Sequence, residues 1–389
     1  TKAAANEMKG RFQELCPGTR GVTFGTFHSV FFWMLRNAYN YTAANIVTDS
    51  EKYGAIRDSI DRHGFRYDSQ EDFAKNVVGE IGNVKSERVS LENYESTTMK
   101  LEDFRIVYDE YENFLRRCGK IDFDDMLVFT YELLSERPDI LKMWQNKFRY
   151  ILIDEFQDIN MIQYDIVKLL AGERQNVFSV GDDDQSVYGF RGAAPAIMKK
   201  FPEDFHGTVI EYLNVNYRCS YDLVECSKRI IQNNRDRYEK QLRSAFAAGQ
   251  SDRVHIVKTD SMTEQNKKII DRITELNRAG IPYREMAIIF RTNTEPRALA
   301  SKLMENGIPF LMKDNIPNIF THFLAENIFD YIRLARGSRD RRTVLRIINK
   351  PNRYISRDAF DSPVVNFEEL RQNYKDKYRI VNNINVLEN

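Results

Sequence analysis

The sequence has few of the residues that build metal centres or covalent frameworks. Among its 389 residues are four cysteines, none in a Cys-x-x-Cys pair, and five scattered histidines. This usage argues against zinc, iron–sulfur and disulfide frameworks and is typical of a protein in the reducing cytosol. We therefore predict a cytoplasmic protein stabilised by packed cores, because a hydrophobic content of 42% over this length suffices for about two or three domains.

Long apolar runs and an excess of one charge are missing as well. No apolar stretch approaches the ~18 residues that a membrane-spanning helix requires. The 57 basic residues balance the 57 acidic ones, so the chain as a whole does not attract nucleic acid electrostatically. Any path for a nucleic acid must therefore be a local groove.

Two short apolar runs that end in acidic residues are the most informative feature of the chain. Residues 151–153 (Ile-Leu-Ile) precede Asp154 and Glu155, and residues 177–180 (Val-Phe-Ser-Val) precede residues 181–185 (Gly-Asp-Asp-Asp-Gln). Runs this short and branched predict strands covered on both faces of a parallel sheet, whose ligands bind beyond the carboxyl ends of the strands. There an Asp can hold Mg²⁺, and a neighbouring Glu can orient or deprotonate the water that attacks a γ-phosphate. The first run alone is also compatible with a strand and a solvated acidic turn.

The residues after both runs resemble a known family. Residues 154–158 (Asp-Glu-Phe-Gln-Asp) are similar to the Walker B motif of the UvrD/Rep-like superfamily 1 helicases. Residues 181–193 (Gly-Asp-Asp-Asp-Gln-Ser-Val-Tyr-Gly-Phe-Arg-Gly-Ala) are similar to the third motif of these helicases. Further segments match the family in its own order, at residues 1–8, 25–29, 122–127, 213–220 and 288–293, the last of them as a strand. We also predict a strand between the two helices of residues 1–37 and another near Val209.

The resemblance implies an α/β fold with RecA-like parallel-sheet motor domains of the P-loop NTPase type and helical insertions. Residues 1–37 and 119–219 would form the first motor domain, 38–118 a helical insertion, 220–335 part of the second motor domain, and 336–389 the start of a second inserted helical domain. The implied function is the central part of an ATP-dependent 3′-to-5′ DNA helicase or translocase. It would use ATP and Mg²⁺ and bind single-stranded DNA and single/double-strand junctions. Two alternatives stay open, a non-catalytic single-strand DNA-binding fragment and the motor portion of a helicase–nuclease.

One part that the family requires does not occur in these residues. A Gly-x-x-x-x-Gly-Lys-Ser/Thr loop, whose backbone cradles phosphates, is found nowhere in the sequence. The sequence opens at Thr1 without an initiator Met and inside the family's second motif, so we expect this loop upstream of Thr1 or not at all. We therefore predict that the 389 residues by themselves hydrolyse little ATP.

The resemblance also implies roles for single residues at a nucleotide. Asp154 and Glu155 would hold Mg²⁺, and Glu155 would also activate water. Gln185 would bond the γ-phosphate or the attacking water. Arg218 would reach the phosphates across the cleft, a task that suits a planar, permanently charged guanidinium fork. Tyr217 would stack on adenine, although ordinary core packing is an alternative for this side chain.

A second set of residues is expected to bind DNA, namely Thr1, Thr26, His28, Tyr188, Phe190 and Arg191. Tyr188 and Phe190 would stack on bases, a sequence-tolerant grip worth ~1–3 kcal/mol per base. Inward packing is the alternative for both, and the family usually has Trp where this chain has Phe190, which predicts a weaker grip. Arg191 would link the nucleotide state to this grip, and His28 would hydrogen-bond in a DNA-facing loop. The two threonines would contact phosphates through their hydroxyls.

Two longer stretches carry patterns of their own. Residues 38–118 lack strand runs, and apolar residues at helical intervals, such as Phe104, Val107 and Tyr111, predict the helical insertion. Residues 333–357 contain nine basic residues and one acidic residue, a local net charge of nine minus one, or +8. This imbalance favours phosphate contact, along one helix face, over a merely solvated surface.

Overall fold

The computed structural model of the protein describes residues 2–65, 70–92, 94–186, 196–234, 237–249, 253–292, 295–312, 323–356, 359–360 and 362–388. The chain divides into two compact units, residues 1–254 and residues 255–389. Among the described residues, no helix is long and apolar enough to cross a membrane.

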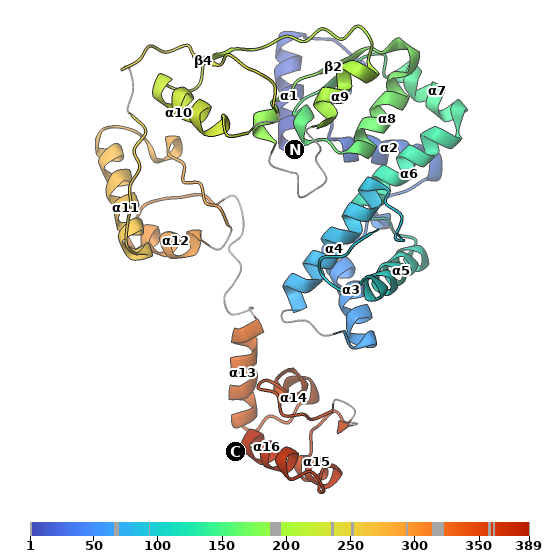
Figure 1. The fold of residues 1–389 in the computed structure, drawn as a ribbon, viewed down its shortest axis with the longest axis vertical. Coiled ribbons are helices and arrows are strands. Elements are labelled where there is room, and N and C mark those ends of the chain that lie inside the picture. The colour runs from blue at the N-terminus through green and yellow to red at the C-terminus, as the bar shows by residue number, and fades with distance from the viewer. Residues whose placement is uncertain are drawn as a thin grey trace. The chain divides into compact units, whose positions relative to one another are not determined.

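The first unit consists of helices and two pairs of short strands (Figure 1). Its helices are α1 (Lys2–Leu15), α2 (Phe27–Tyr39), α3 (Asp49–His63), α4 (Gln70–Glu87), α5 (Leu101–Cys118), α6 (Phe123–Glu136), α7 (Pro138–Lys147), α8 (Met161–Ala171), α9 (Ala196–Asp204) and α10 (Tyr221–Ile231). The 3₁₀ turns that the structure describes in it are η1 (Ala43–Asn45), η2 (Phe156–Asp158), η3 (Gly172–Arg174) and η4 (Asp183–Gln185). Its strands pair in parallel, β1 (Ile151–Ile153) with β2 (Val177–Ser179) and β3 (Val215–Asn216) with β4 (Arg243–Ser244).

The β1–β2 pair is covered on one face by helices. Ile153 belongs to an apolar core that also contains Tyr164 of α8 and Phe201 of α9. Leu152 and Phe178, which lie opposite each other in the two strands, are 73% and 62% exposed. The prediction that both faces are covered is therefore wrong for the described residues. Because side chains alternate along a strand, helices that pack on one side protect only every second residue.

Helices α3, α4 and α5 form a separate core within the first unit, and Figure 1 shows them grouped beside α6. Phe104, Val107, Tyr111 and Leu115 of α5 are buried in this core at intervals of three and four residues. This is the helical spacing that the sequence predicted. The helix ends at Gly119, whose φ of +61° is a conformation that glycine adopts without strain.

The second unit contains two groups of helices with their own cores. Its described elements are α11 (Met262–Arg278), η6 (Tyr283–Glu285), α12 (Pro296–Glu305), α13 (Phe323–Ala335), α14 (Arg341–Ile347), α15 (Phe367–Asn373) and α16 (Tyr378–Glu388). One core joins α11 to α12 through Ile273, Leu299 and Leu303. The other core brings together helices α13, α14, α15 and α16, with Val344 and Ile384 among its buried residues.

Three stretches predicted as strands are not strands in the structure. They are the segment between α1 and α2, the residues around Val209, and residues 288–290. Val209 is 79% exposed and Ile289 is 92% exposed. A strand needs a neighbour to satisfy its backbone groups, and the described part of the chain offers none to these stretches.

The basic stretch from residue 333 to residue 357 is not one helix face, because α13 ends at Ala335 and α14 begins at Arg341. Several of its arginines bond their own unit instead. Arg346 forms a fork on the fully buried Asp330, with Nε 2.6 Å from Oδ2 and Nη2 2.8 Å from Oδ1. The buried Arg353 donates to the carbonyls of Ile347 and Ile348, both at 3.2 Å. Phosphate contact therefore stays a prediction only for the exposed members of the stretch, such as Arg336 and Arg342.

Candidate nucleotide site

The polar loops that follow β1 and β2 lie side by side. The nitrogen of Val180 donates to the carbonyl of Ile153 over 2.8 Å, and the nitrogen of Phe156 donates to the carbonyl of Val180 over 2.9 Å. These bonds extend the parallel register past the ends of both strands. The structure thus brings the loop that carries Asp154 and Glu155 against the loop that ends in residues 181–185.

The buried amide of Gln157 joins these two loops. Gln157 is only 2% exposed; its Nε2 donates to Glu155 Oε2 over 2.7 Å, and its Oε1 accepts from the nitrogen of Asp182 over 3.0 Å. One end of an amide donates and the other accepts, so Gln157 can serve a carboxylate and an N–H group at once. The sequence interpretation gave this residue no role. An amide two positions beyond Glu155 was the signal that could have revealed it.

Gly181 allows the two loops to approach each other closely. A Cβ atom at this position would lie 2.9 Å from Gln157 Oε1 and 3.2 Å from Phe156 Cβ. Both atoms belong to buried residues of the opposite loop, so they have little room to move. A larger residue at position 181 would push the loops apart.

Glu155 has a strained backbone at the predicted metal and water position. Its φ is +52°, a left-handed conformation that costs a residue with a side chain roughly 1–2 kcal/mol. Such strain is concentrated at functional sites, where the surrounding structure holds it in place. The nitrogen of Glu155 donates to Asp154 Oδ1 over 3.0 Å, and both residues are exposed.

The donor set beside β1 fits a magnesium ion. Asp154 and Glu155 offer exposed carboxylate oxygens, the ligand type that Mg²⁺ prefers. Asp158 lies near them: burial and the negative charge of Glu155 raise the pKa of its carboxyl group. Its Oδ1 is buried and accepts no hydrogen bond from any residue that the structure describes. A cation at this edge would therefore relieve an existing excess of negative charge.

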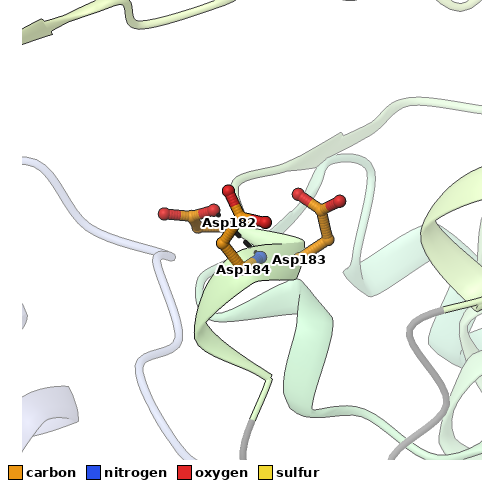
Figure 2. Close-up of side chains that lie close together, drawn as sticks. All are labelled: Asp182, Asp183 and Asp184. Atoms are coloured by element: carbon orange, nitrogen blue, oxygen red, sulfur yellow. Dashed lines mark hydrogen bonds between the residues drawn. The ribbon is translucent and has the colours of Figure 1, made fainter. Parts of the chain in front are cut away.

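Gln185 closes the turn after β2. Its nitrogen donates to the carbonyl of Asp182 over 2.9 Å, and its side-chain Nε2 donates to Asp182 Oδ2 over 2.7 Å. Gln185 is exposed, so the rest of its amide remains accessible to a ligand. Asp182 also accepts from the nitrogen of Asp184 over 3.2 Å, the bond drawn in Figure 2.

Tyr217 and Arg218 follow β3 directly. Tyr217 is 77% exposed and packs in no core of the described residues, so its stacking on adenine stays a prediction. Asn216 Oδ1 accepts from the nitrogens of Arg218 and Cys219 over 2.9 and 2.8 Å, so the turn that presents both side chains is locally fixed. Arg218 is exposed and free to reach a phosphate.

The residues predicted to bind DNA fall into two groups. Thr26 caps α2, where its Oγ1 accepts from the nitrogen of Ser29 over 3.3 Å. His28 lies in the first turn of that helix rather than in a loop, with its ring edge against Phe123 at 5.6 Å between centroids. Burial lowers the pKa of His28, against an opposing effect of Asp124. The other predicted DNA contacts lie outside the described residues, namely Thr1, Tyr188, Phe190 and Arg191.

Two protein-family models together match nearly the whole chain. The UvrD/REP helicase N-terminal domain matches residues 1–206, and the UvrD-like helicase C-terminal domain matches residues 211–387. The chain belongs to the UvrD/REP helicase family. This confirms the family that the Walker B-like and third motifs predicted. The N-terminal match contains Glu155 and Gln185, whereas the C-terminal match contains Tyr217 and Arg218.

Curated members of the UvrD/REP family agree with this assignment. A protein of Staphylococcus epidermidis named ATP-dependent DNA helicase PcrA is 32% identical over 368 residues, and one of the same name from Staphylococcus aureus is 31% identical over 363 residues. Each match covers 91% of this chain and 49% of the relative. The chain therefore spans about half the length of the curated relatives it matches.

Proposed function

We propose that the chain is the central part of an ATP-dependent DNA helicase or translocase, which couples ATP hydrolysis to movement on single-stranded DNA. The observation that carries the proposal is the bridge by Gln157 between the Glu155 loop and the loop of Asp182 and Gln185. Such a bridge fixes a carboxylate and a polar turn at one sheet edge, where nucleotides bind. The names of the relatives support ATP and DNA as ligands. The 3′-to-5′ direction and the binding of single/double-strand junctions rest on the family resemblance.

The proposal includes two RecA-like motor domains with helical insertions. Residues 1–37 and 119–219 would belong to the first motor domain and residues 220–335 to the second. The helices of residues 38–118 would form the first insertion, which their separate core supports. Residues 336–389 would begin a second insertion, supported by the core that joins α13 to α16.

In this mechanism the chain's own residues orient water and nucleotide. Asp154 and Glu155 would hold Mg²⁺, which neutralises phosphate charge when bound. Gln157 occupies Oε2 of Glu155, so Oε1 is left to accept a proton from the attacking water. Gln185 would bond the γ-phosphate or that water, and Arg218 would stabilise the charge that develops on the phosphate.

A kinetic comparison tests this function in the longest polypeptide that the gene encodes. We expect ATP turnover that single-stranded DNA stimulates. Glu155→Gln should lower turnover by ~10²-fold or more, because the amide cannot accept the proton, while ATP affinity changes little. Glu173→Gln, an exposed change in η3, is the matched control. Near-normal turnover in Glu155→Gln would contradict the assignment, and DNA binding without turnover in the unaltered protein would favour the non-catalytic alternative.

A further inference from the structure

Three consecutive carboxylates crowd the turn that ends in Gln185. One oxygen of each of Asp182, Asp183 and Asp184 lies within 4.8 Å of the others, and Figure 2 shows them on one short helical turn. Negative charges this close repel one another, so the turn needs cations to stabilise it. The cations come from a segment more than fifty positions later in the chain, residues 237–240.

Lys240 and Arg237 neutralise this turn. Lys240 Nζ pairs with all three aspartates and lies 3.2 Å from Asp184 Oδ2, although its side chain is only 18% exposed. Arg237 forms a fork on Asp184, with Nε 2.7 Å from Oδ1 and Nη2 2.5 Å from Oδ2. Burial lowers the pKa of Lys240, but its bonds to Asp182 and Asp183 outweigh burial and raise it overall. The ammonium therefore stays charged at neutral pH.

Asp182 connects Lys240 to the catalytic candidate Gln185. Its Oδ1 pairs with Lys240, and its Oδ2 accepts from Gln185 Nε2 over 2.7 Å. An ionised carboxylate only accepts, so the amide nitrogen of Gln185 must face Asp182. The Oε1 atom and the second N–H of Gln185 then point elsewhere and are available to water and phosphate. Lys240 thus holds Asp182 in place, and Asp182 in turn sets the orientation of the Gln185 amide.

The same segment leads directly to the strand beside Tyr217 and Arg218. Three positions after Lys240, β4 begins, and the nitrogen of Arg243 donates to the carbonyl of Asn214 over 2.8 Å. Ser244 Oγ donates to the carbonyl of Cys219 over 2.8 Å, just beyond Arg218. The ion pairs of Lys240 therefore connect the Gln185 turn to the β3–β4 pair.

We propose that Lys240, assisted by Arg237, is a positioning residue that orients the Gln185 amide and couples it to the segment carrying Tyr217 and Arg218. The inference rests on the proposed function, because the orientation of Gln185 matters for turnover only if the site hydrolyses a nucleotide. Lys240 acts through Asp182 and contacts no substrate itself. The ion pairs are the structural basis of the proposal. Lys240 stands 22 positions beyond Arg218, the last residue to which the sequence interpretation gave a role at the nucleotide.

Steady-state kinetics on the longest polypeptide that the gene encodes measures this role. Lys240→Met should lower kcat for ATP by about tenfold or more and leave KM within about threefold, the pattern of a group that acts in the transition state. Lys240→Arg should restore most of kcat, since it keeps the charge. Lys228→Met is the matched control, because among the described residues Lys228 pairs only with Glu225 of its own helix, at 2.7 Å. A kcat as high as that of the control, or a rise in KM alone, would overturn the proposal.

A double-mutant cycle separates positioning from general stability. If Lys240 acts through Gln185, Lys240→Met should lower kcat little further once Gln185→Ala is present, because interacting residues are not additive. Equal losses in both backgrounds would overturn the proposal. Should Lys240→Met fail to fold, Arg237→Gln replaces it in the same cycle, with a smaller expected loss.

Hydrogen exchange on the 389-residue chain gives a readout that does not depend on ATP hydrolysis. The nitrogens of Asp184 and Gln185 both donate to Asp182, so Lys240→Met should speed their exchange by about tenfold or more and Lys228→Met should not. If the exchange of these two nitrogens is unchanged in Lys240→Met, Lys240 does not position the turn and the proposal is overturned. Faster exchange in the 389-residue chain, together with no DNA-stimulated ATPase in the longest polypeptide that the gene encodes, would instead mean that the proposed function has failed and the ion pairs stand.

Discussion

Lys85 Nζ lies 2.7 Å from Asp125 Oδ1 in the interior of the first unit, where it joins α4 to α6. The same ammonium reaches Asp122 Oδ2 at 3.0 Å and Glu112 Oε1 at 2.6 Å, and the Lys85 side chain is only 4% exposed. Burial alone would lower the pKa of Lys85, but Asp122, Asp125 and Glu112 outweigh it and raise the pKa. One cation thus stabilises three carboxylates at the point where the α3–α5 helices meet the rest of the unit.

We expect Lys85→Met to destabilise the first unit by roughly 3–5 kcal/mol, because removing one partner of a buried ion pair leaves uncompensated charge. Lys75→Met, on an exposed position of the same helix, is the matched control and should change stability little. Urea denaturation of both variants, followed by circular dichroism, measures the difference. If Lys85→Met loses no more stability than Lys75→Met, the three carboxylates do not depend on this cation.

The Asp125 carboxyl predicts how stability changes with pH. Burial and the charge of Asp122 raise its pKa to about 7 from an ordinary 3.8, while Lys85 opposes the rise. The folded state therefore keeps a proton between pH 4 and pH 7 that the unfolded state releases, so this group makes folding less favourable as pH rises through that range. Asp122 has a lowered pKa, so it acts below this window.

Asp125→Asn removes this titration. Relative to the unaltered chain, the variant should therefore gain on the order of 2 kcal/mol of stability between pH 5 and pH 8. Thermal unfolding of both proteins over this range measures how their difference in stability changes with pH, with the exposed Asp109→Asn as control. If the free energies of unfolding of Asp125→Asn and the unaltered chain differ by the same amount at every pH, Asp125 is not the titrating group.

The features that the sequence predicted correctly are encoded locally. The runs at residues 151–153 and 177–179 form adjacent parallel strands, and the acidic loops follow them as expected. The buried face of α5 follows from the spacing of Phe104, Val107 and Tyr111. In each case the residues of the run or helix itself decide which element forms, so a pattern of residues is sufficient to predict the element.

The features that the sequence did not reveal depend on distant pairs. Lys85 meets Asp125 forty positions later, and Lys240 meets Asp182 at a separation of 58. The charge count of residues 333–357 could not show that Arg346 bonds a buried aspartate on another helix. Composition gives the number of charges, but only the fold determines which of them neutralise one another.

Glu155 offers a test of backbone strain at the site. Glu155→Ala and Glu155→Gly both remove the carboxylate and its bond to Gln157, so they differ chiefly in the cost of the +52° φ. We expect the glycine variant to be more stable than the alanine variant by about 1 kcal/mol, the reverse of the order in an ordinary helix. Denaturant midpoints of the two variants decide this. A more stable alanine variant would mean that position 155 is not held in the left-handed conformation.

Gln157→Leu tests whether turnover depends on the orientation of the Glu155 side chain, because this variant keeps Glu155 and removes only the amide that bonds it. Leucine fills a similar volume but cannot donate to Glu155 or accept from the nitrogen of Asp182, so the two loops lose their bridge. We expect kcat for ATP to fall by about tenfold or more, since misplaced catalytic groups cost one to two orders of magnitude. Gln145→Leu is the matched control, because Gln145 Nε2 bonds the carbonyl of Leu169, away from both loops. Equal kcat values for the two variants would remove Gln157 from the site.

Gln157→Glu gives the same bridge a signature in the pH dependence of turnover. In the unaltered protein Gln157 Nε2 donates to Glu155 Oε2 over 2.7 Å. An ionised glutamate at position 157 cannot donate this hydrogen bond, and it places a second negative charge beside Glu155. A like charge at this distance favours the protonated form of a carboxyl group and so raises its pKa. In the proposed mechanism Glu155 accepts a proton from water and must be ionised to do so. The acidic limb of the kcat profile should therefore move to higher pH, with partial recovery of turnover above neutrality. The profile is measured on the longest polypeptide that the gene encodes, beside that of Gln145→Glu. A uniform loss at every pH would mean that Gln157 supports the loops without acting on the charge of Glu155.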